Sequence, residues 1–417
     1  MHFLSPGRPK GLLFGVLLAA VPVLAPAQPA LTLEAAENMA LQEEPTIARY
    51  RERAAAREEA AVAAGALPDP LLITELMDVP ADRPRLDGDE MTQFKVGLRQ
   101  AFPRGQTRTL RQERGGLRAS QAHARGDDAE RAALNAVRQA YLRLYNQRRA
   151  VALLEGNRSH FEELLEITER ALAAGRVSRQ DVIRAELELE RLEDRLSAAR
   201  AAEADAESAL ARWIGPQAAR RPLPDALPEL ALPDDNGIDH HPLLQAQDLA
   251  VADQRRGVDL ARQGYRPEWS VELTYGMATG NDMDAPDRLS AMVVLDLPLF
   301  TRNRQDRDVA ASRREVYAAK HDREVQHRTL TQALASQAAR WQRLRERERR
   351  FEERLLIHAA DNVEAAEQAY RAGTLAFTAL MQARITYLET HLDAVQVATD
   401  RRMAQAELLY LSGATRR

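Results

Sequence analysis

The chain has 417 residues, a formal net charge of −4 at pH 7 and no cysteine. The slightly acidic balance argues against a nucleic-acid-binding protein, for which a basic face is expected. Without cysteine there is no disulfide, thiolate metal site, cysteine nucleophile or lipid on an N-terminal cysteine.

Residues 1–27 are predicted to be an export signal peptide that is cleaved. Arg8 and Lys10 form its basic start, residues 11–24 its apolar segment and residues 25–27 a small-residue cleavage site. The apolar segment is shorter than the roughly 20 residues that a membrane-spanning helix needs, and no later stretch reaches that length. We therefore expect an exported chain that begins near Gln28 and crosses no membrane with a helix.

The sequence repeats itself at an offset near 198 residues. At this offset Phe102-Pro103-Arg104 matches Phe300-Thr301-Arg302, and Ala174-Gly175 matches Ala372-Gly373. Prolines concentrated between the two copies break any helix there. The predicted parts are a first structural repeat over residues 28–215, a proline-rich connector over 216–238 and a second repeat over 239–417.

Each repeat is predicted to contain a medium helix, two antiparallel strands, a very long helix, a tight turn and another long helix. Residues 105–173 and 303–372 lack proline and are rich in Ala, Glu, Arg, Gln and Leu, so each is predicted to form one helix on the order of 100 Å long. Gly175 and Gly373 end these helices at two tips, because glycine tolerates the positive φ of a helix C-cap. Ser178 and Thr374 are available to cap the return helices, which run to roughly Trp213 and Leu411. The strands are expected at about 71–79, 91–100, 269–278 and 289–297.

The strands alternate between apolar and polar residues, which predicts a sheet with two different faces. The polar face is expected to line a lumen. In the first strand Glu75 interrupts the expected apolar side. The predicted lumen-facing residues are Gln93, Lys95, Arg99, Ser270, Glu272 and Thr274, and the predicted apolar face comprises Leu71, Ile73, Met77, Val79, Phe94, Val96, Leu98, Trp269, Val271, Leu273, Tyr275, Met277, Leu289, Ala291, Val293, Leu295 and Leu297.

Strands of about ten residues with one apolar face are typical of transmembrane β-barrels. Four strands cannot close a barrel, and an open sheet edge is not tolerated in lipid, so several chains must complete it. Two chains would give a bore filled by side chains, whereas three leave a pore. The expected fold is mainly α with a small transmembrane β part, assembled as a trimer with a 12-stranded barrel and an α-helical tunnel. The alternative is a periplasmic coiled-coil scaffold or adaptor without a pore, whose sheet packs its apolar face on helices.

These features resemble the TolC-like outer-membrane efflux protein family over essentially the whole mature chain. Besides the duplicated halves and strand pairs, the resemblance rests on the turns Ala-Leu-Ala-Ala-Gly-Arg-Val-Ser at 171–178 and Ala-Tyr-Arg-Ala-Gly-Thr-Leu at 369–375, and on Leu-Tyr-Leu-Ser-Gly at 409–413. The strand-to-helix junctions at 100–105 and 297–304 are most similar to the heavy-metal branch of the family (CusC/CzcC-type).

The resemblance implies a homotrimer in the outer membrane of a Gram-negative bacterium, surrounded by outer-membrane lipid and extending into the periplasm. Its partners would be a periplasmic membrane-fusion adaptor and an inner-membrane RND-type pump. The chain would be the outer-membrane channel of a tripartite efflux system and a passive exit duct for heavy-metal cations. Drug or organic-solute efflux and type I secretion are the alternatives.

The resemblance also places the two tips at the periplasmic end, where the adaptor docks. The family's acidic entrance ring falls on Ala379 and Gln382, neither of which is acidic. Asp181 is therefore the expected acidic entrance residue, and its pairing with Arg371 or Arg184 would hold the tips shut. The predicted docking residues are Gly175, Arg176, Ser178, Gly373 and Thr374.

No chemistry-bearing motif points to an enzyme. The sequence has no phosphate-binding glycine loop, no nucleophile elbow and no His/Asp/Glu grouping at metal-ligand spacing. His240 and His241 adjoin the connector without a neighbouring carboxylate or thiolate cluster, and Tyr141, Tyr145 and Trp213 are interpreted as packing residues. We predict no catalytic residue, no cofactor and no bound metal.

Overall fold

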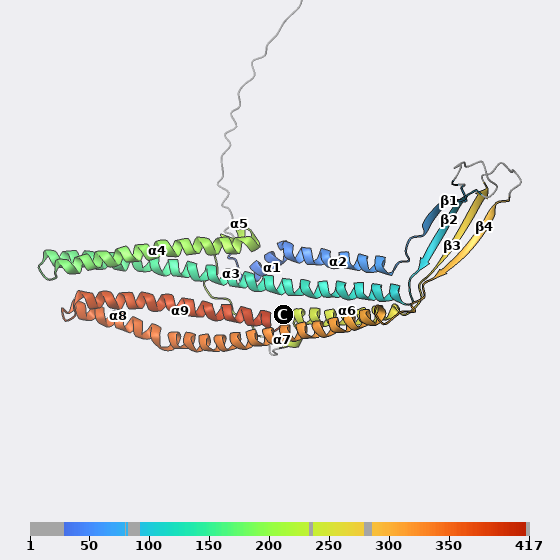
Figure 1. Ribbon diagram of the computed structural model, residues 1–417. Coiled ribbons are helices and arrows are strands. Elements are labelled where there is room, and N and C mark those ends of the chain that lie inside the picture. Colours follow the sequence, from blue (N-terminus) through green and yellow to red (C-terminus); the bar gives the residue numbers. More distant parts are fainter. Residues whose placement is uncertain (1–28, 80, 82–91, 233–236, 279–285, 414–417) are drawn as a thin grey trace, which may run out of the picture.

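The computed structural model describes residues 29–79, 81, 92–232, 237–278 and 286–413. The predicted export signal lies outside these residues. So do most residues of the loop between the two strands of the first repeat and of the loop between the two strands of the second repeat. The described chain is strongly elongated, with a sheet at one end and two helical hairpin tips at the other (Figure 1).

The order of elements in the first half recurs in the second. The offset of 198 residues separates the first residues of β1 and β3, of α3 and α7, and of α4 and α9. The first half contains α1 (Leu33–Glu43), α2 (Pro45–Gly65), β1 (Leu71–Met77), β2 (Gln93–Phe102), α3 (Thr107–Ala173) and α4 (Arg179–Ile214). After α5 (Pro216–Ala219) and the short η1 (Ile238–His240), the second half contains α6 (Pro242–Gln263), β3 (Trp269–Ala278), β4 (Arg288–Leu295), α7 (Gln305–Arg350), η2 (Phe351–Leu355), α8 (Leu356–Arg371) and α9 (Phe377–Leu411).

The two long helices differ in regularity. α3 is one helix of 67 residues, about 100 Å at 1.5 Å per residue. Its counterpart is helical without a break from Gln305 to Arg371, as predicted, but the π-helical turn η2 divides it into α7 and α8. A π turn interrupts the regular hydrogen-bond ladder and bends a helix, and α8 leaves the line of α7 in Figure 1.

The helices form a wall one layer thick. Toward the tips the order across the wall is α4, α3, α9 and α8, and toward the sheet it is α2, α3, α6 and α7. Near the tips a shared core that includes Leu154, Phe161, Leu192, Phe377 and Leu388 joins the two hairpins. A one-layer wall leaves two broad faces and two outer edges uncovered in a single chain.

The four strands form one antiparallel sheet in the order β1-β2-β3-β4, so β2 and β3 join the two halves. The sheet projects beyond the ends of the helices (Figure 1). Its apolar side chains are uncovered: Leu72 is 68% exposed, Leu98 57% and Leu289 75%. The alternative in which these side chains pack on the chain's own helices is therefore wrong. Among the described helices, none combines the length and apolarity required to cross a membrane.

The face assigned to β1 from the sequence was wrong by one residue. Ile73 pairs with Gly97 and Glu75 with Lys95, and directly paired residues share a face. Leu71, Ile73 and Met77 therefore lie on the polar face with Glu75, and Leu72, Thr74 and Leu76 lie on the apolar face. A shift of one residue exchanges the two faces of a strand, and the consecutive Leu71-Leu72 made the alternation ambiguous. β1 also ends at Met77 rather than Val79, because Asp78 adopts a left-handed φ of 56°.

Candidate functional site at the tips and on the polar strand face

The first tip is a helix end closed by glycine. Gly175 has a φ of 66°, its amide donates to Leu172 O at 2.9 Å, and the amide of Arg176 donates to Ala171 O at 2.9 Å. These two bonds satisfy carbonyls that the end of α3 would otherwise leave free. A Cβ on Gly175 would meet nothing within 4 Å, so backbone conformation, rather than crowding, favours glycine here.

The helix that leaves this tip begins with a reciprocal cap. The Ser178 hydroxyl accepts from the Asp181 amide at 3.3 Å, and the Asp181 carboxylate accepts from the Ser178 amide at 3.0 Å and from its hydroxyl at 2.7 Å. The hydrogen bond from the Ser178 side chain, followed by that from its backbone, lowers the pKa of Asp181. Ser178 is thus the predicted N-cap of α4, and Asp181 is a fixed carboxylate at the tip.

The second tip closes in the same way but restarts differently. Gly373 has a φ of 72°, and the amides of Gly373 and Thr374 donate to Tyr370 O and Ala369 O at 3.0 Å. The Thr374 hydroxyl donates to Ala369 O as well, so Thr374 completes the end of α8. The prediction that Thr374 caps α9 was wrong, since the N-cap is Ala376 and no side chain bonds to the first turn.

The two residues predicted as a gate each bind within their own hairpin. Arg371 pairs with Glu367 at 3.5 Å, and Arg384 from α9 pairs with the same carboxylate. Within the described residues, Asp181 and Arg371 form no ion pair with each other. A contact between them therefore requires a different chain or a movement of the tips.

The six residues predicted to line a lumen share one face of the sheet. The register pairs Arg99 with Glu272 and Gly97 with Thr274, and Nε of Arg99 donates to the Glu272 carboxylate at 2.7 Å. Gln93, Lys95 and Ser270 have the same strand parity and lie on this face. Glu75, Arg288 and Ser290 also belong to it by register, although the sequence analysis did not select them.

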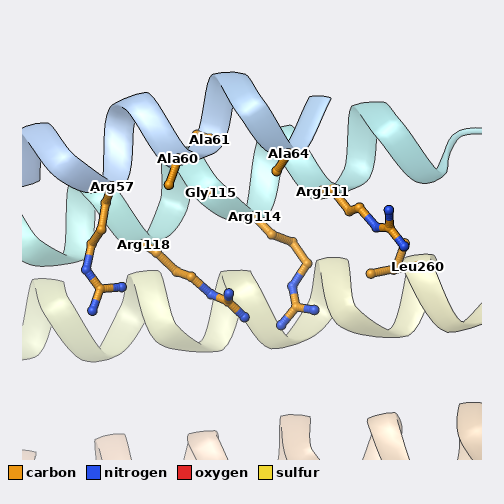
Figure 2. A pocket seen from close by; sticks show the side chains of 9 residues that line it. All are labelled: Arg57, Ala60, Ala61, Ala64, Arg111, Arg114, Gly115, Arg118 and Leu260. Carbon is orange, nitrogen blue, oxygen red and sulfur yellow. The ribbon is translucent and has the colours of Figure 1, made fainter. Parts of the chain in front are cut away.

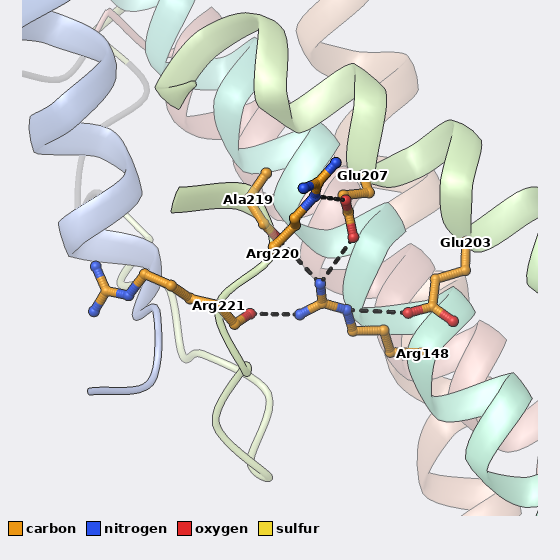
Figure 3. A network of polar contacts seen from close by, with 6 residues as sticks. All are labelled: Arg148, Glu203, Glu207, Ala219, Arg220 and Arg221. Carbon is orange, nitrogen blue, oxygen red and sulfur yellow. Dashed lines mark hydrogen bonds and ion pairs between the residues drawn. The ribbon is translucent and has the colours of Figure 1, made fainter. Parts of the chain in front are cut away.

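A feature that sequence reasoning missed is how the connector is fastened. Arg148 of α3 donates to Arg221 O at 2.7 Å and to Ala219 O at 3.0 Å, and it pairs with Glu203 and Glu207 of α4 (Figure 3). The hydroxyl of Tyr145 donates to Asp225 O at 2.6 Å. Residues 216–232, which we call the belt, are thus held across the wall mainly through their backbone carbonyls. Because every residue has a backbone carbonyl, such contacts cannot be predicted from residue types.

The belt reaches a buried ionic cluster in the second half. Glu348 of α7 pairs with both Arg401 and Arg402 of α9, and Arg402 also pairs with Glu229 of the belt at 2.9 Å. Glu348 lies just before the π turn η2. The cluster therefore joins α7, α9 and the belt beside the point where the second long helix bends.

The histidine, tyrosine and tryptophan residues considered in the sequence are involved in helix capping and packing. His241 is fully buried, and its Nδ1 accepts from the Leu243 amide as the N-cap of α6. Tyr141 packs in the core around α1 and α4, as predicted, and Trp213 packs against the same cluster. Tyr145 is also buried, and its hydroxyl binds the belt. Over the part of the chain that the structure describes, no group of three or more His, Asp or Glu side chains could hold a metal ion.

Comparison with known proteins identifies the family. The family described as Outer membrane efflux protein matches residues 37–216 and again residues 236–414. The chain belongs to this family. Its members are outer-membrane efflux channels, and the double match coincides with the repeated order of elements in this efflux protein.

Solved structures share the fold at low sequence identity. A membrane protein from Pseudomonas aeruginosa superposes with a TM-score of 0.79 at 18% identity, covering 91% of this chain and 90% of its own. The outer membrane protein VceC from Vibrio cholerae gives 0.77 at 16% identity (91% and 96% covered), and CusC gives 0.78 at 14% identity (92% of both). Because these scores are so similar, the fold does not single out the heavy-metal branch. Among curated proteins, no sequence match reached significance.

Proposed function

We propose that this efflux protein is the outer-membrane exit duct of a tripartite efflux system and works passively as a homotrimer. The observation that carries the proposal is the two-faced sheet. Leu98 and Val293 on one face are 57% and 58% exposed, whereas the opposite face carries Lys95, Arg99 and Glu272. An apolar outer face and a polar inner face suit a barrel in lipid.

The edges of the chain support assembly from several copies. β1 and β4 each lack a partner on one side within the described sheet, and unpaired edges in lipid must be closed. The helices at the outer edges of the wall also carry exposed apolar side chains. These are Val62 (65%) on α2 and Ile183 (53%) on α4 at one edge, and Tyr317 (57%) and Val325 (64%) on α7 with Ile357 (51%) on α8 at the other. Three copies in a ring would bring the unlike edges together.

The tips are proposed to receive the periplasmic adaptor and, through it, the inner-membrane RND-type pump. The docking surface would include Gly175, Arg176, Ser178, Gly373 and Thr374, at the end of the molecule farthest from the sheet (Figure 1). Asp181 and Arg371 would contribute to a gate by pairing between tips of neighbouring chains. The pump supplies the energy and the duct supplies the path.

The cargo proposed from the junction sequences is a heavy-metal cation, with drugs, other organic solutes or secreted polypeptide as alternatives. A wide duct need not bind what passes through it. Cargo can be assigned by deleting the protein from its host and measuring resistance to metal salts and to drugs in parallel. Loss of resistance to drugs alone would overturn the heavy-metal proposal.

Conductance tests the proposal as a whole. Protein purified from membranes and added to a planar lipid bilayer should produce discrete conductance steps, and heat should convert a trimer band on a gel to monomer. Protein that stays soluble without detergent and gives no conductance would overturn the proposal.

A further inference from the structure

Near the sheet end of the wall, α2, α3 and α6 surround a cavity of about 250 Å³ (Figure 2). Arginine side chains from two different helices line it and extend toward α6, over a floor of small and apolar residues. We call it the arginine cavity. Its basic residues are Arg57 of α2 and Arg111, Arg114 and Arg118 of α3, and its floor includes Ala61, Gly115 and Leu260.

The arginine cavity carries an excess of positive charge. Arg114 and Arg118 share one carboxylate, that of Asp253 on α6, at 2.7 and 3.2 Å. Among the described residues, no carboxylate lies within ion-pair distance of Arg57 or Arg111. Four guanidinium groups thus line the cavity against one carboxylate, and this imbalance of charge favours a bound anion. Guanidinium groups bind carboxylates and phosphates through paired N–H donors.

The floor is built by close packing of α2 on α3. A Cβ on Gly115 would lie 2.5 Å from the Cβ of Ala61, so the two helices could not approach this closely with a larger residue there. Small residues below and long basic side chains above give a hollow with an apolar base and a charged rim. This shape suits a solute that has a small apolar body and one anionic group.

Helix periodicity places the cavity on the face of the wall opposite the belt. Arg114 and Arg118 precede Tyr141 and Tyr145 by 27 residues on the unbroken α3, which is about 7.5 turns and reverses the direction of the side chain. The hydroxyls of Tyr141 and Tyr145 bind Leu31 O and Asp225 O, in the N-terminal segment and the belt. In a ring of three walls, belts on the inner face would fill the passage, so the belt lies outside and the cavity faces inward. This step rests on the proposed duct.

We propose that the arginine cavity is a binding site for anionic solutes in the passage, namely molecules with a carboxylate or phosphate group on a small apolar body. Arginines also line a second groove in the second half, where Arg340, Arg343 and Arg347 of α7 lie with Asp400 of α9. The class of solute that fits this site is an anion, so a metal would bind there only as an anionic complex, whereas a bare metal cation would pass through the duct without binding at the site.

Binding of phenyl phosphate tests the site directly. Calorimetry at low ionic strength on the detergent-solubilised protein should detect binding, and Arg57→Gln with Arg111→Gln should weaken it by about tenfold or more. The control carries Arg51→Gln with Arg255→Gln, which removes the same charge at exposed positions outside the cavity and should leave the affinity unchanged. Absence of binding to the wild-type protein, or equal affinity in all three proteins, would overturn the proposal.

Ion selectivity separates this proposal from the proposed duct. In a potassium chloride gradient across a bilayer, Arg57→Gln with Arg111→Gln should shift the reversal potential toward cation selectivity, and the control variant should not. Phenyl phosphate binding without any conductance would contradict the duct and leave the site standing. Conductance with the same selectivity in all three proteins would overturn the role of the cavity in the passage.

Discussion

Arg99 and Glu272 form an ion pair across the seam between the two repeats. Nε of Arg99 on β2 donates to the Glu272 carboxylate on β3 at 2.7 Å, and these two strands join the halves of the sheet. The Glu272 side chain is only 12% exposed, and that of Arg99 is 40% exposed. Because no loop links β2 directly to β3, cross-strand pairs such as this one specify which strands meet.

Charge reversal at this pair should destabilise the assembly. Arg99→Glu would place two carboxylates on directly paired residues, at a cost of about 1 kcal/mol. We expect the trimer band on gels to dissociate at a lower temperature. The double variant Arg99→Glu with Glu272→Arg should recover most of the loss, and a double variant no more stable than the single one would contradict a role for the pair.

His241 should make stability depend on pH. Burial, followed by the positive charge of Arg131, lowers the pKa of His241 to about 4. An unfolded histidine titrates near pH 6.5, so on acidification the unfolded chain takes up this proton first. The free energy of unfolding is therefore highest above pH 6.5, decreases as the pH falls from 6.5 to 4 and is constant below pH 4. The total loss from this group is about 3 kcal/mol.

Denaturant midpoints measured across this pH range check the assignment. The control is His241→Asn, because asparagine also caps a helix N-terminus but does not titrate. The wild-type protein should lose stability between pH 6.5 and 4 more steeply than this variant. Equal slopes would mean that His241 does not cause the pH dependence.

The tip glycines should be more sensitive to substitution than a glycine inside a helix. Gly175→Ala or Gly373→Ala forces a residue with a Cβ into left-handed backbone, at a cost of about 1 kcal/mol. Gly156→Ala in the middle of α3 should instead stabilise by roughly 0.5–1 kcal/mol. A Cβ added at any of the three positions would meet no atom within 4 Å, so the comparison isolates backbone conformation. Thermal unfolding followed by circular dichroism should give opposite signs, and a stabilised tip variant would contradict the account.

The ionic cluster beside the π turn should be costly to break. The Glu348 and Arg402 side chains are 9% and 10% exposed, and removal of one partner from a buried pair costs about 3 kcal/mol or more. Glu348→Ala should therefore lower the unfolding midpoint strongly. Glu346→Ala, at an exposed position on the same helix, should have little effect. Similar losses in the two variants would show that the cluster does not stabilise the junction of α7, α9 and the belt.

The sequence predicted the repeated hairpins because glycine and proline mark chain breaks clearly. Gly175 and Gly373 gave both turns, and strict alternation gave β3 over residues 269–278. β1 was assigned to the wrong face because Leu71 and Leu72 are both apolar, and pairing with β2 decided the register. Thr374 was mistaken for an N-cap because its true partner is a carbonyl of the preceding helix.

The arginine cavity was missed because it joins Arg57 to Arg111, which only the packing of α2 on α3 brings together. The sequence held one sign of this cavity: Arg111 and Arg118 are two helical turns apart, so they lie on the same face of α3.

The unpaired edges allow the central claim to be tested in a chain that has no cysteine of its own. Thr74→Cys on β1 can be combined in turn with Leu289→Cys, Ala291→Cys or Val293→Cys on β4, which covers neighbouring registers. Edge strands of one four-stranded sheet lie about 14 Å apart, whereas a disulfide needs Cα atoms within roughly 7 Å, so a disulfide must join different chains.

Oxidation of these variants in intact outer membranes, followed by denaturing electrophoresis, is the most direct measurement. At least one pair should give covalent dimers and trimers and nothing larger, because three sheets close one barrel. Monomer alone with every pair, or a ladder that continues beyond three chains, would contradict a trimeric barrel.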